Sequence, residues 1–301
     1  MIDYVKGYFD VNYKHEIDSF LLDNCDRYDL IRTYNCSTSE IYVPFRGRLH
    51  NLEIVSTKIR PTFIQNSLHS FFNALTIGEA KNYDDFHYEN LKSVLKYLEN
   101  EFGTELFNKI YPTQLEFGFN IDFFMDASVF IDKKILMYKN KLPTYSKSNS
   151  KMCIKKFIHE DFELKVYDKG KESKLKQSNL IRIEIKYTGA NVLNKFGIYT
   201  LMDLSKKSVL ESIFSDFIKR VNDLFIINCV ACNLEELGLT EKEQLLISQY
   251  SNPNYWADLT KTEKEKQLKT WRALEKKHNL NSYKKILIEL ISEKFKNLLN
   301  N

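Results

Sequence analysis

Alternating apolar and polar residues predict a strand near the middle of the chain. Between residues 115 and 123, leucine, isoleucine and phenylalanine occupy every second position, and polar residues or glycine occupy the positions between them. Successive side chains of a strand point to opposite faces of its sheet. The apolar residues therefore share one face, and Glu116 lies on the other.

The same kind of pattern predicts further strands on both sides of this one. β-branched and aromatic residues, which are typical of strands, are frequent at 3–9, 50–56, 153–158, 163–167 and 180–187. In the last of these strands, isoleucines occupy the odd positions from 181 to 185. Its other face carries Arg182, Glu184 and Lys186.

Apolar residues that recur every three or four positions predict helices elsewhere. Such patterns cover residues 88–102 and 209–225, and they are typical of amphipathic helices. A capping box at Thr240–Glu243 begins another helix. Pro253 ends that helix, because proline and the residue before it resist helical dihedral angles.

Two more helical patterns, at about 260–278 and 282–299, complete the C-terminal region. We expect an α+β fold, with an antiparallel sheet that has helices packed on one face and an all-helical C-terminal tail. The expected domains are a body over residues 1–232 and a basic helical domain over residues 240–301.

Composition and charge narrow the class of protein. The chain has 301 residues, of which 43% are hydrophobic and 14% aromatic, so it can form a large core and is not a disordered or collagen-like chain. It has no apolar run of about 18 residues and no secretory start, and its five cysteines are an odd number. We therefore expect a cytoplasmic protein without a membrane partner.

The positive charge is concentrated in the tail. From Thr240 onwards there are 12 Lys or Arg residues against 8 Asp or Glu residues, whereas the rest of the chain has 32 of each. A basic helical appendage is typical of an arm that binds a polyanion, although a solvated helix face has the same composition.

The polar faces of the predicted strands offer candidate chemistry. Glu116, Tyr167 and Glu184 occupy polar positions of three different strands. Carboxylates on one sheet face can hold a divalent cation and bring a phenol next to a phosphodiester. An ordinary half-solvated antiparallel sheet alternates in the same way, so the spacing alone leaves both interpretations open.

Three segments resemble a known family, namely the replication initiators of filamentous phages and related small plasmids and phages, of the gene II type. The segments are LEFGFNI at 115–121, VYDKGKE at 166–172 and LIRIEIK at 180–186, the last followed by KFGI at 195–198 and LMDL at 201–204. With the segments LEI at 52–54 and NSLHSFFN at 66–73, the resemblance extends over roughly residues 1–225. It implies a rolling-circle nickase that cuts double-stranded DNA at a replication origin.

The resemblance implies a role for individual residues. Tyr167 matches the nucleophile, which would become linked to a 5′ phosphate, free a 3′ hydroxyl and later rejoin the strand. Lys169 would assist, because a phenol with a pKa near ~10 needs a cation close by to be a good nucleophile. Tyr187 remains the rival nucleophile. The cofactor would be Mg²⁺ or Mn²⁺, with candidate ligands Glu116, Glu184, Glu172 and His69.

One feature departs from the wider rolling-circle class. Many of its members hold the metal with a His-x-His pair, and the six histidines here, at 15, 50, 69, 87, 159 and 278, form no such pair. Carboxylates are therefore expected to be the main ligands, and the absence puts the metal site in doubt.

The expected partners are double-stranded origin DNA, the nicked single strand, and a host helicase and polymerase. Candidate DNA-binding residues are Lys139, Lys141, Lys147, Lys151, Lys155, Lys156, Arg182, Lys186, Lys264, Arg272 and Lys276. Two other functions stay open. One is a non-catalytic, sequence-specific DNA-binding initiator or repressor, and the other is a tyrosine relaxase for conjugal transfer.

Overall fold

The computed structural model describes residues 1–300 apart from 35–36, 39–40, 145–152, 177–178 and 229–237. Its large sheet has nine strands in the order β2-β3-β4-β5-β1-β6-β10-β9-β8, and every neighbouring pair is antiparallel. These strands are β1 (Ile2–Phe9), β2 (Ile31–Tyr34), β3 (Ile41–Leu49), β4 (Leu52–Ser56), β5 (Phe63–Ser67), β6 (Ile110–Asp122), β8 (Ile154–Ile158), β9 (Phe162–Asp168) and β10 (Leu180–Thr188). The antiparallel sheet predicted from the sequence is confirmed.

The longest helices are α3, α8, α11 and α12, and the other helices are shorter. In chain order, the helices are α1 (Lys14–Asp23), α2 (Leu68–Ile77), α3 (Tyr88–Phe102), α4 (Thr104–Phe107), α5 (Ala127–Val129), α6 (Lys169–Glu172), α7 (Ala190–Asn194), α8 (Lys207–Asn222), α9 (Glu241–Tyr250), α10 (Pro253–Ala257), α11 (Lys261–His278) and α12 (Ser282–Asn300). The short elements η1 (Val11–Tyr13), η2 (Phe130–Lys134) and η3 (Leu201–Ser205) complete the set.

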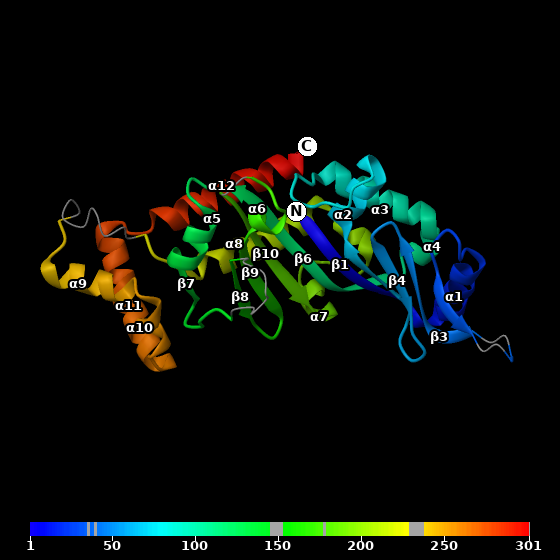
Figure 1. Ribbon diagram of the computed structural model, residues 1–301, viewed down its shortest axis with the longest axis horizontal. Coiled ribbons are helices and arrows are strands. Elements are labelled where there is room, and N and C mark those ends of the chain that lie inside the picture. Colours follow the sequence, from blue (N-terminus) through cyan, green and yellow to red (C-terminus); the bar gives the residue numbers. More distant parts are fainter. Residues whose placement is uncertain (35–36, 39–40, 145–152, 177–178, 229–237, 301) are drawn as a thin grey trace.

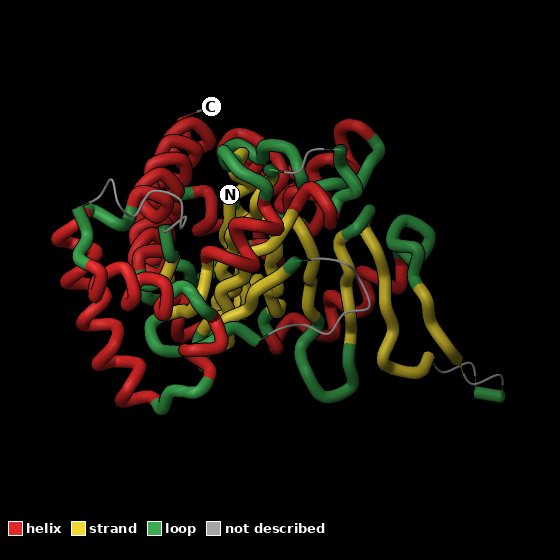
Figure 2. Tube along the Cα trace, turned by 60° about the vertical axis from the view of Figure 1, so that its left-hand side comes forward, coloured by secondary structure: helices red, strands yellow, loops and turns green. Residues whose placement is uncertain are grey.

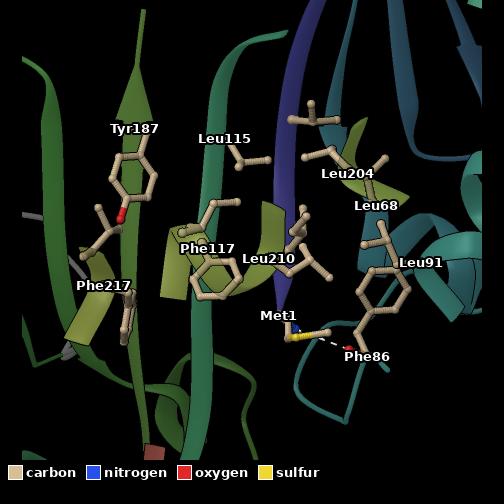
Figure 3. Packing of buried hydrophobic residues seen from close by; sticks show 14 of the residues in the cluster. Met1, Leu68, Phe86, Leu91, Leu115, Phe117, Tyr187, Leu204, Leu210 and Phe217 are labelled. Atoms are coloured by element: carbon tan, nitrogen blue, oxygen red, sulfur yellow. Dashed lines mark hydrogen bonds between the residues drawn. The ribbon is translucent and has the colours of Figure 1, made fainter. Parts of the chain in front are cut away.

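Helices α8 and α12 cover the apolar face of the central strands. Phe117 and Phe119 of β6 contact Phe217 of α8 and Phe295 of α12, with ring centroids 5.2–6.4 Å apart. Phe295 also stacks on Phe214 of α8 at 3.9 Å. Figure 3 shows Phe117 and neighbouring side chains in this layer. The alternation in residues 115–123 is thus explained by burial of one face under helices, as predicted.

A second core joins the tail to a small sheet. Strands β7 (Ile135–Tyr138) and β11 (Leu224–Ile226) form a two-stranded antiparallel ribbon. Leu136 and Met137 of β7 and Phe225 of β11 belong to the same hydrophobic cluster as Trp256 of α10 and Trp271 of α11. In Figures 1 and 2, α9, α10 and α11 lie beyond one end of the large sheet. The predicted capping box is present, since Thr240 and Glu243 bond each other at the start of α9.

The expected helical tail therefore belongs to two cores. Helices α9 to α11 pack on the small sheet, whereas α12 returns to the large sheet and contributes Leu287, Ile291 and Phe295 to its core. Within the described residues, no helix is both long enough and apolar enough to cross a membrane.

Candidate functional site

Three carboxylates meet on the polar face of the large sheet. Glu116 comes from β6, Glu184 from β10 and Asp3 from β1. Each offers an oxygen that lies within 4.8 Å of the oxygens of the other two. Glu116 and Glu184 are diagonal neighbours, because Glu184 pairs with Gly118 in the β10–β6 ladder, and both face the same way, as the alternation predicts.

Gly118 allows β6 and β10 to approach closely at this point. A Cβ atom at residue 118 would lie 2.6 Å from the carbonyl oxygen of Ile183 and 2.6 Å from the Cβ atom of Glu184. Real Cβ atoms do not approach backbone oxygen atoms so closely. The glycine in the LEFGFNI segment therefore helps to set the position of Glu184 relative to Glu116.

Two basic side chains neutralise the carboxylates. Lys165 Nζ, from β9, lies 3.1 Å from Glu116 Oε1 and 3.1 Å from Glu184 Oε1. Arg182, from β10, donates from Nε to Glu184 at 2.6 Å and from a terminal nitrogen to Asp3 at 2.7 Å. Because buried charges are tolerated when they are paired, these contacts let the carboxylates stay ionised.

The pKa values of the two glutamates are shifted in opposite directions. Burial and the nearby Glu184 raise the pKa of Glu116. Burial would also raise the pKa of Glu184, but Arg182 and Lys165 outweigh it and hold that pKa below its usual range. For Lys165, burial favours the neutral amine, yet the two glutamates raise its pKa overall. The ammonium form of Lys165 is thus bound between the two acids.

Tyr167 lies beside this cluster. Its hydroxyl donates a hydrogen bond to Glu184 Oε2 at 3.3 Å, and the residue is 8% exposed. Burial raises the pKa of Tyr167 well above its ordinary value. Tyr187 lies on the opposite, apolar face, where it is fully buried and donates to Asp216 of α8 at 2.9 Å. Of the two candidate nucleophiles, Tyr167 is the one on the face with the carboxylates.

The other predicted residues lie around the cluster. Lys169 is buried at the start of α6 and donates to Asn82 at 2.8 Å and to Glu172 at 2.6 Å. Its Nζ atom is 6.0 Å from the centre of the Tyr167 ring. Glu172 therefore pairs with Lys169, and the carboxylate group within 4.8 Å consists of Asp3, Glu116 and Glu184 instead.

His69 lines a small cavity together with Asp3 and Arg182. It belongs to α2, stacks on Phe86 and has its Nε2 atom 2.7 Å from Asp84 Oδ1. Burial lowers the pKa of His69 to about 4. The imidazole is therefore neutral near pH 7, which is the form that binds metals.

The predicted DNA-binding residues fall into different environments. Lys155 is 2% exposed and donates to the backbone carbonyls of Asp132 and Ile135, and burial lowers its pKa to about 8. Arg182 is also buried, within the cluster described above. These two side chains are therefore occupied inside the protein rather than presented to a DNA backbone.

The remaining basic candidates lie nearer the surface. Lys186 is 3.7 Å from Glu116, Lys156 is 3.7 Å from Glu163, and Lys139 is 3.3 Å from Asp223. At or near the surface are also Lys141, Lys264, Arg272 and Lys276. Lys147 and Lys151 lie outside the described residues.

The carboxylates are suitable ligands for the expected cofactor. Mg²⁺ and Mn²⁺ prefer oxygen ligands, and three carboxylates within 4.8 Å supply them. The space between Glu116 and Glu184 is bridged by the ammonium of Lys165. A cation bound to both glutamates therefore requires Lys165 to move.

Sequence reasoning missed Asp3 and Lys165. Asp3 lies between Ile2 and Tyr4 near the start of β1. An acidic residue at this point of a mostly apolar strand was the available sign that it has a role in the site. Its place next to Arg182 depends on the pairing of β1 with β6, between segments more than 100 residues apart. Lys165 alternates with apolar residues on β9 and was not distinguished from the other lysines.

The comparisons with known proteins include a structural likeness. The sequence matches no family model and no curated protein. Among solved structures, the chain is similar to the rolling circle replication initiator protein from Geobacillus stearothermophilus, with a TM-score of 0.43 and 10% sequence identity over 83% of this chain and 96% of that chain.

Proposed function

We propose that this protein is a replication initiator that makes a site-specific nick in double-stranded origin DNA through Tyr167. One arrangement supports the proposal: the hydroxyl of Tyr167 contacts Glu184 on the sheet face that also carries Glu116 and Asp3. A nucleophile, a carboxylate that can accept its proton and oxygen ligands for a cation are the parts that phosphodiester cleavage by tyrosine needs.

In this reaction the phenolic oxygen of Tyr167 attacks a phosphorus atom of the DNA backbone. The bond from phosphorus to the 3′ oxygen breaks, the phenolic proton passes by way of Glu184 to solvent, and the 3′ oxygen takes a proton from solvent. The products are a 5′-phosphotyrosine link and a free 3′ hydroxyl for a host polymerase. Because the ester conserves the energy of the phosphodiester, the reverse reaction rejoins the strand.

The residues around Tyr167 determine when it can react. Its pKa is raised by burial, so the neutral phenol is the resting state. Glu116, Glu184 and Asp3 would hold Mg²⁺ or Mn²⁺, which supplies positive charge for the phosphate oxygens and lowers the pKa of groups beside it. Lys169, 6.0 Å from the ring centre, adds positive charge near Tyr167.

A non-catalytic DNA-binding protein is the alternative. The observation that favours it is the burial of Tyr167, which is 8% exposed and must become accessible before it can reach a phosphodiester. The same basic residues would then bind the origin without cutting it, as an initiator or a repressor does.

A nicking assay separates the two functions. Purified protein is incubated with a supercoiled plasmid that carries the origin of the replicon encoding the chain, with Mg²⁺, with Mn²⁺ or with EDTA. We expect open circles with either metal and a protein–DNA adduct that survives a denaturing gel. Tyr167→Phe should abolish both products.

Tyr187→Phe is the matched control, because it removes the same hydroxyl from the opposite face of the sheet. This variant should still nick. A gel shift of the origin with no nick under any metal would favour the binding protein, and nicking by Tyr167→Phe would exclude Tyr167 as the nucleophile.

A further inference from the structure

A cationic and aromatic surface lies on the polar face of the sheet, away from the carboxylates. It is formed by β1, β3, β5 and the turn between β4 and β5, and in Figure 1 that turn extends below the sheet. We call it the hairpin patch, and it consists of Lys6, Tyr8, Arg46, Lys58, Arg60 and Phe63. Neither the sequence motifs nor the predicted DNA-binding residues include any member of this patch.

The aromatic rings of the hairpin patch are combined with a lysine. Tyr8 and Phe63 are cross-strand partners, and their ring centroids are 5.2 Å apart. Lys6 Nζ lies 4.0 Å from the Phe63 centroid and 5.3 Å from the Tyr8 centroid. All three side chains are only partly buried. A half-open pair of rings beside a cation is the combination that holds the bases and phosphates of single strands.

The turn adds an exposed apolar side chain between two cations. Ile59 is 93% exposed, and Lys58 and Arg60 on either side of it are also exposed. The turn is held in place by Thr57, whose hydroxyl accepts from the backbone N–H of Arg60 at 3.0 Å. Among the described residues, no ion pair involves Lys6, Lys58 or Arg60. These cations are therefore available for an anionic partner.

The hairpin patch is continuous with the candidate site. Lys6 lies opposite Gln114 in the β1–β6 ladder, and Glu116 is two positions further along the same face of β6, about 7 Å away. Tyr4, also on this face, lies between the two, with Lys186 Nζ 4.6 Å from its ring centre. A strand of nucleic acid that lies along this face would therefore run from the hairpin patch towards the carboxylate cluster, beside the buried Tyr167.

We propose that the hairpin patch binds the single-stranded DNA adjoining the nick, an inference that rests on the proposed function. Four of its six side chains are cationic; Arg46 is paired with Glu53 at 3.3 Å, and the positive charge of Lys6, Lys58 and Arg60 matches a polyanion. Its rings select single strands over duplex, because the faces of bases are free to stack on a protein ring only when the bases are unpaired. The patch thus holds one strand on the sheet face that carries Tyr167.

Fluorescence anisotropy in EDTA measures this binding without any reaction. The ligand is a fluorescein-labelled single strand of mixed sequence, about 12 nucleotides long, titrated at several salt concentrations. The double variant Lys58→Gln/Arg60→Gln should bind about tenfold more weakly, and the slope of log affinity against log salt should fall in magnitude by about 1.4. Phe63→Leu, which keeps apolar volume but removes the ring, should weaken binding about fivefold or more.

The matched control removes two lysines from the helical layer on the other side of the sheet. Lys92 and Lys96 are exposed on α3, so Lys92→Gln/Lys96→Gln changes the net charge equally and should leave affinity and salt slope close to those of the unchanged protein. Circular dichroism establishes that each variant is folded. Because Lys58 and Arg60 are exposed turn residues, their double variant tests the inference even if Phe63→Leu does not fold.

Equal affinity for the unchanged protein and the folded Lys58→Gln/Arg60→Gln variant overturns the inference, as does an equal loss in the α3 control. Preferred binding of a duplex of the same length would also overturn it. Nicking without any effect of the patch variants on binding leaves the proposed function in place. Patch-dependent binding without nicking would support single-strand binding by the patch but would overturn its link to a nick, together with the catalytic function.

Discussion

Replacing Lys165 by methionine tests whether the ammonium group holds the carboxylate cluster together. Methionine has nearly the same length as lysine but carries no charge, so Lys165→Met leaves Glu116 and Glu184 without the cation that lies 3.1 Å from each. Removing one partner of a buried ion pair costs about 3–5 kcal/mol. Since the Lys165 side chain is 16% exposed, we expect the lower end, about 3 kcal/mol.

Thermal unfolding followed by circular dichroism measures this loss. For a chain of this size, about 3 kcal/mol corresponds to a decrease in melting temperature of roughly 5–10 °C near pH 7. Lys156→Met is the control, because Lys156 lies on the neighbouring strand β8 and pairs at 3.7 Å with Glu163, outside the cluster. That variant should change the melting temperature by no more than about 2 °C.

The loss of stability in Lys165→Met should depend on pH. The pKa of Glu116 is already raised, first by burial and then by Glu184, and removing Lys165 raises it further. A carboxyl group whose pKa is higher in the folded than in the unfolded protein lowers stability above its unfolded pKa. The deficit is therefore largest above the range in which Glu116 loses its proton, and it decreases as the pH falls through that range.

Mn²⁺ gives a second readout of the same variant. If the carboxylates bind a divalent cation, Mn²⁺ should raise the melting temperature of Lys165→Met more than that of the unchanged protein, because no ammonium has to leave. A variant that melts like the unchanged protein at pH 7 would refute the role of Lys165. A variant that is destabilised but indifferent to Mn²⁺ would refute the metal site.

Three further substitutions test the fold around the site. Tyr187→Phe should lower the free energy of unfolding by about 1.5–3 kcal/mol, because it removes a buried hydrogen bond to the carboxylate of Asp216, and urea titration measures the change. Phe295→Ala should cost about 3–5 kcal/mol in the same titration, since the ring stacks inside the large core; a loss below about 1 kcal/mol would mean that α12 is dispensable for the body. Gly118→Ala should cost about 1–3 kcal/mol and also abolish nicking, because its Cβ would displace Glu184; unchanged stability and nicking would show that the close approach is not needed.

The sequence predicted the strands and helices with strong periodicity. The strand at 180–187 and the helix at 88–102 appear as β10 and α3 with nearly the expected bounds, whereas the central strand expected at 115–123 appears as the longer β6, which begins at Ile110. All three are recognisable because each has one face buried in the same core. Strands β2, β3, β5, β7 and β11 were not predicted. Several of these are short, and β5 carries polar residues such as Gln65 and Asn66, so pairing with neighbouring strands determines their structure.

Only those parts of the candidate site could be predicted that follow from the alternation of polar and apolar residues within one strand. Glu116 and Glu184 share a face because each alternates with apolar residues on its own strand, and the β6–β10 pairing places them together. The contribution of Asp3 depends on the β1–β6 pairing, which no local pattern reveals. Lys169 lies just beyond β9, which ends at Asp168, in a short helix whose start the alternation of the strand does not reveal.

The two cations in the cluster differ in their freedom to leave it, and this difference decides how the site can take up a divalent ion. Arg182 is 3% exposed and is fixed by Glu184, Asp3 and Asn120, the last at 3.0 Å. Lys165 is more exposed and has a long flexible side chain that bonds to the two glutamates alone in the described structure. Its displacement would leave Arg182 in place to orient Glu184, so a divalent ion can replace the Lys165 charge without releasing the other carboxylate contacts of Arg182.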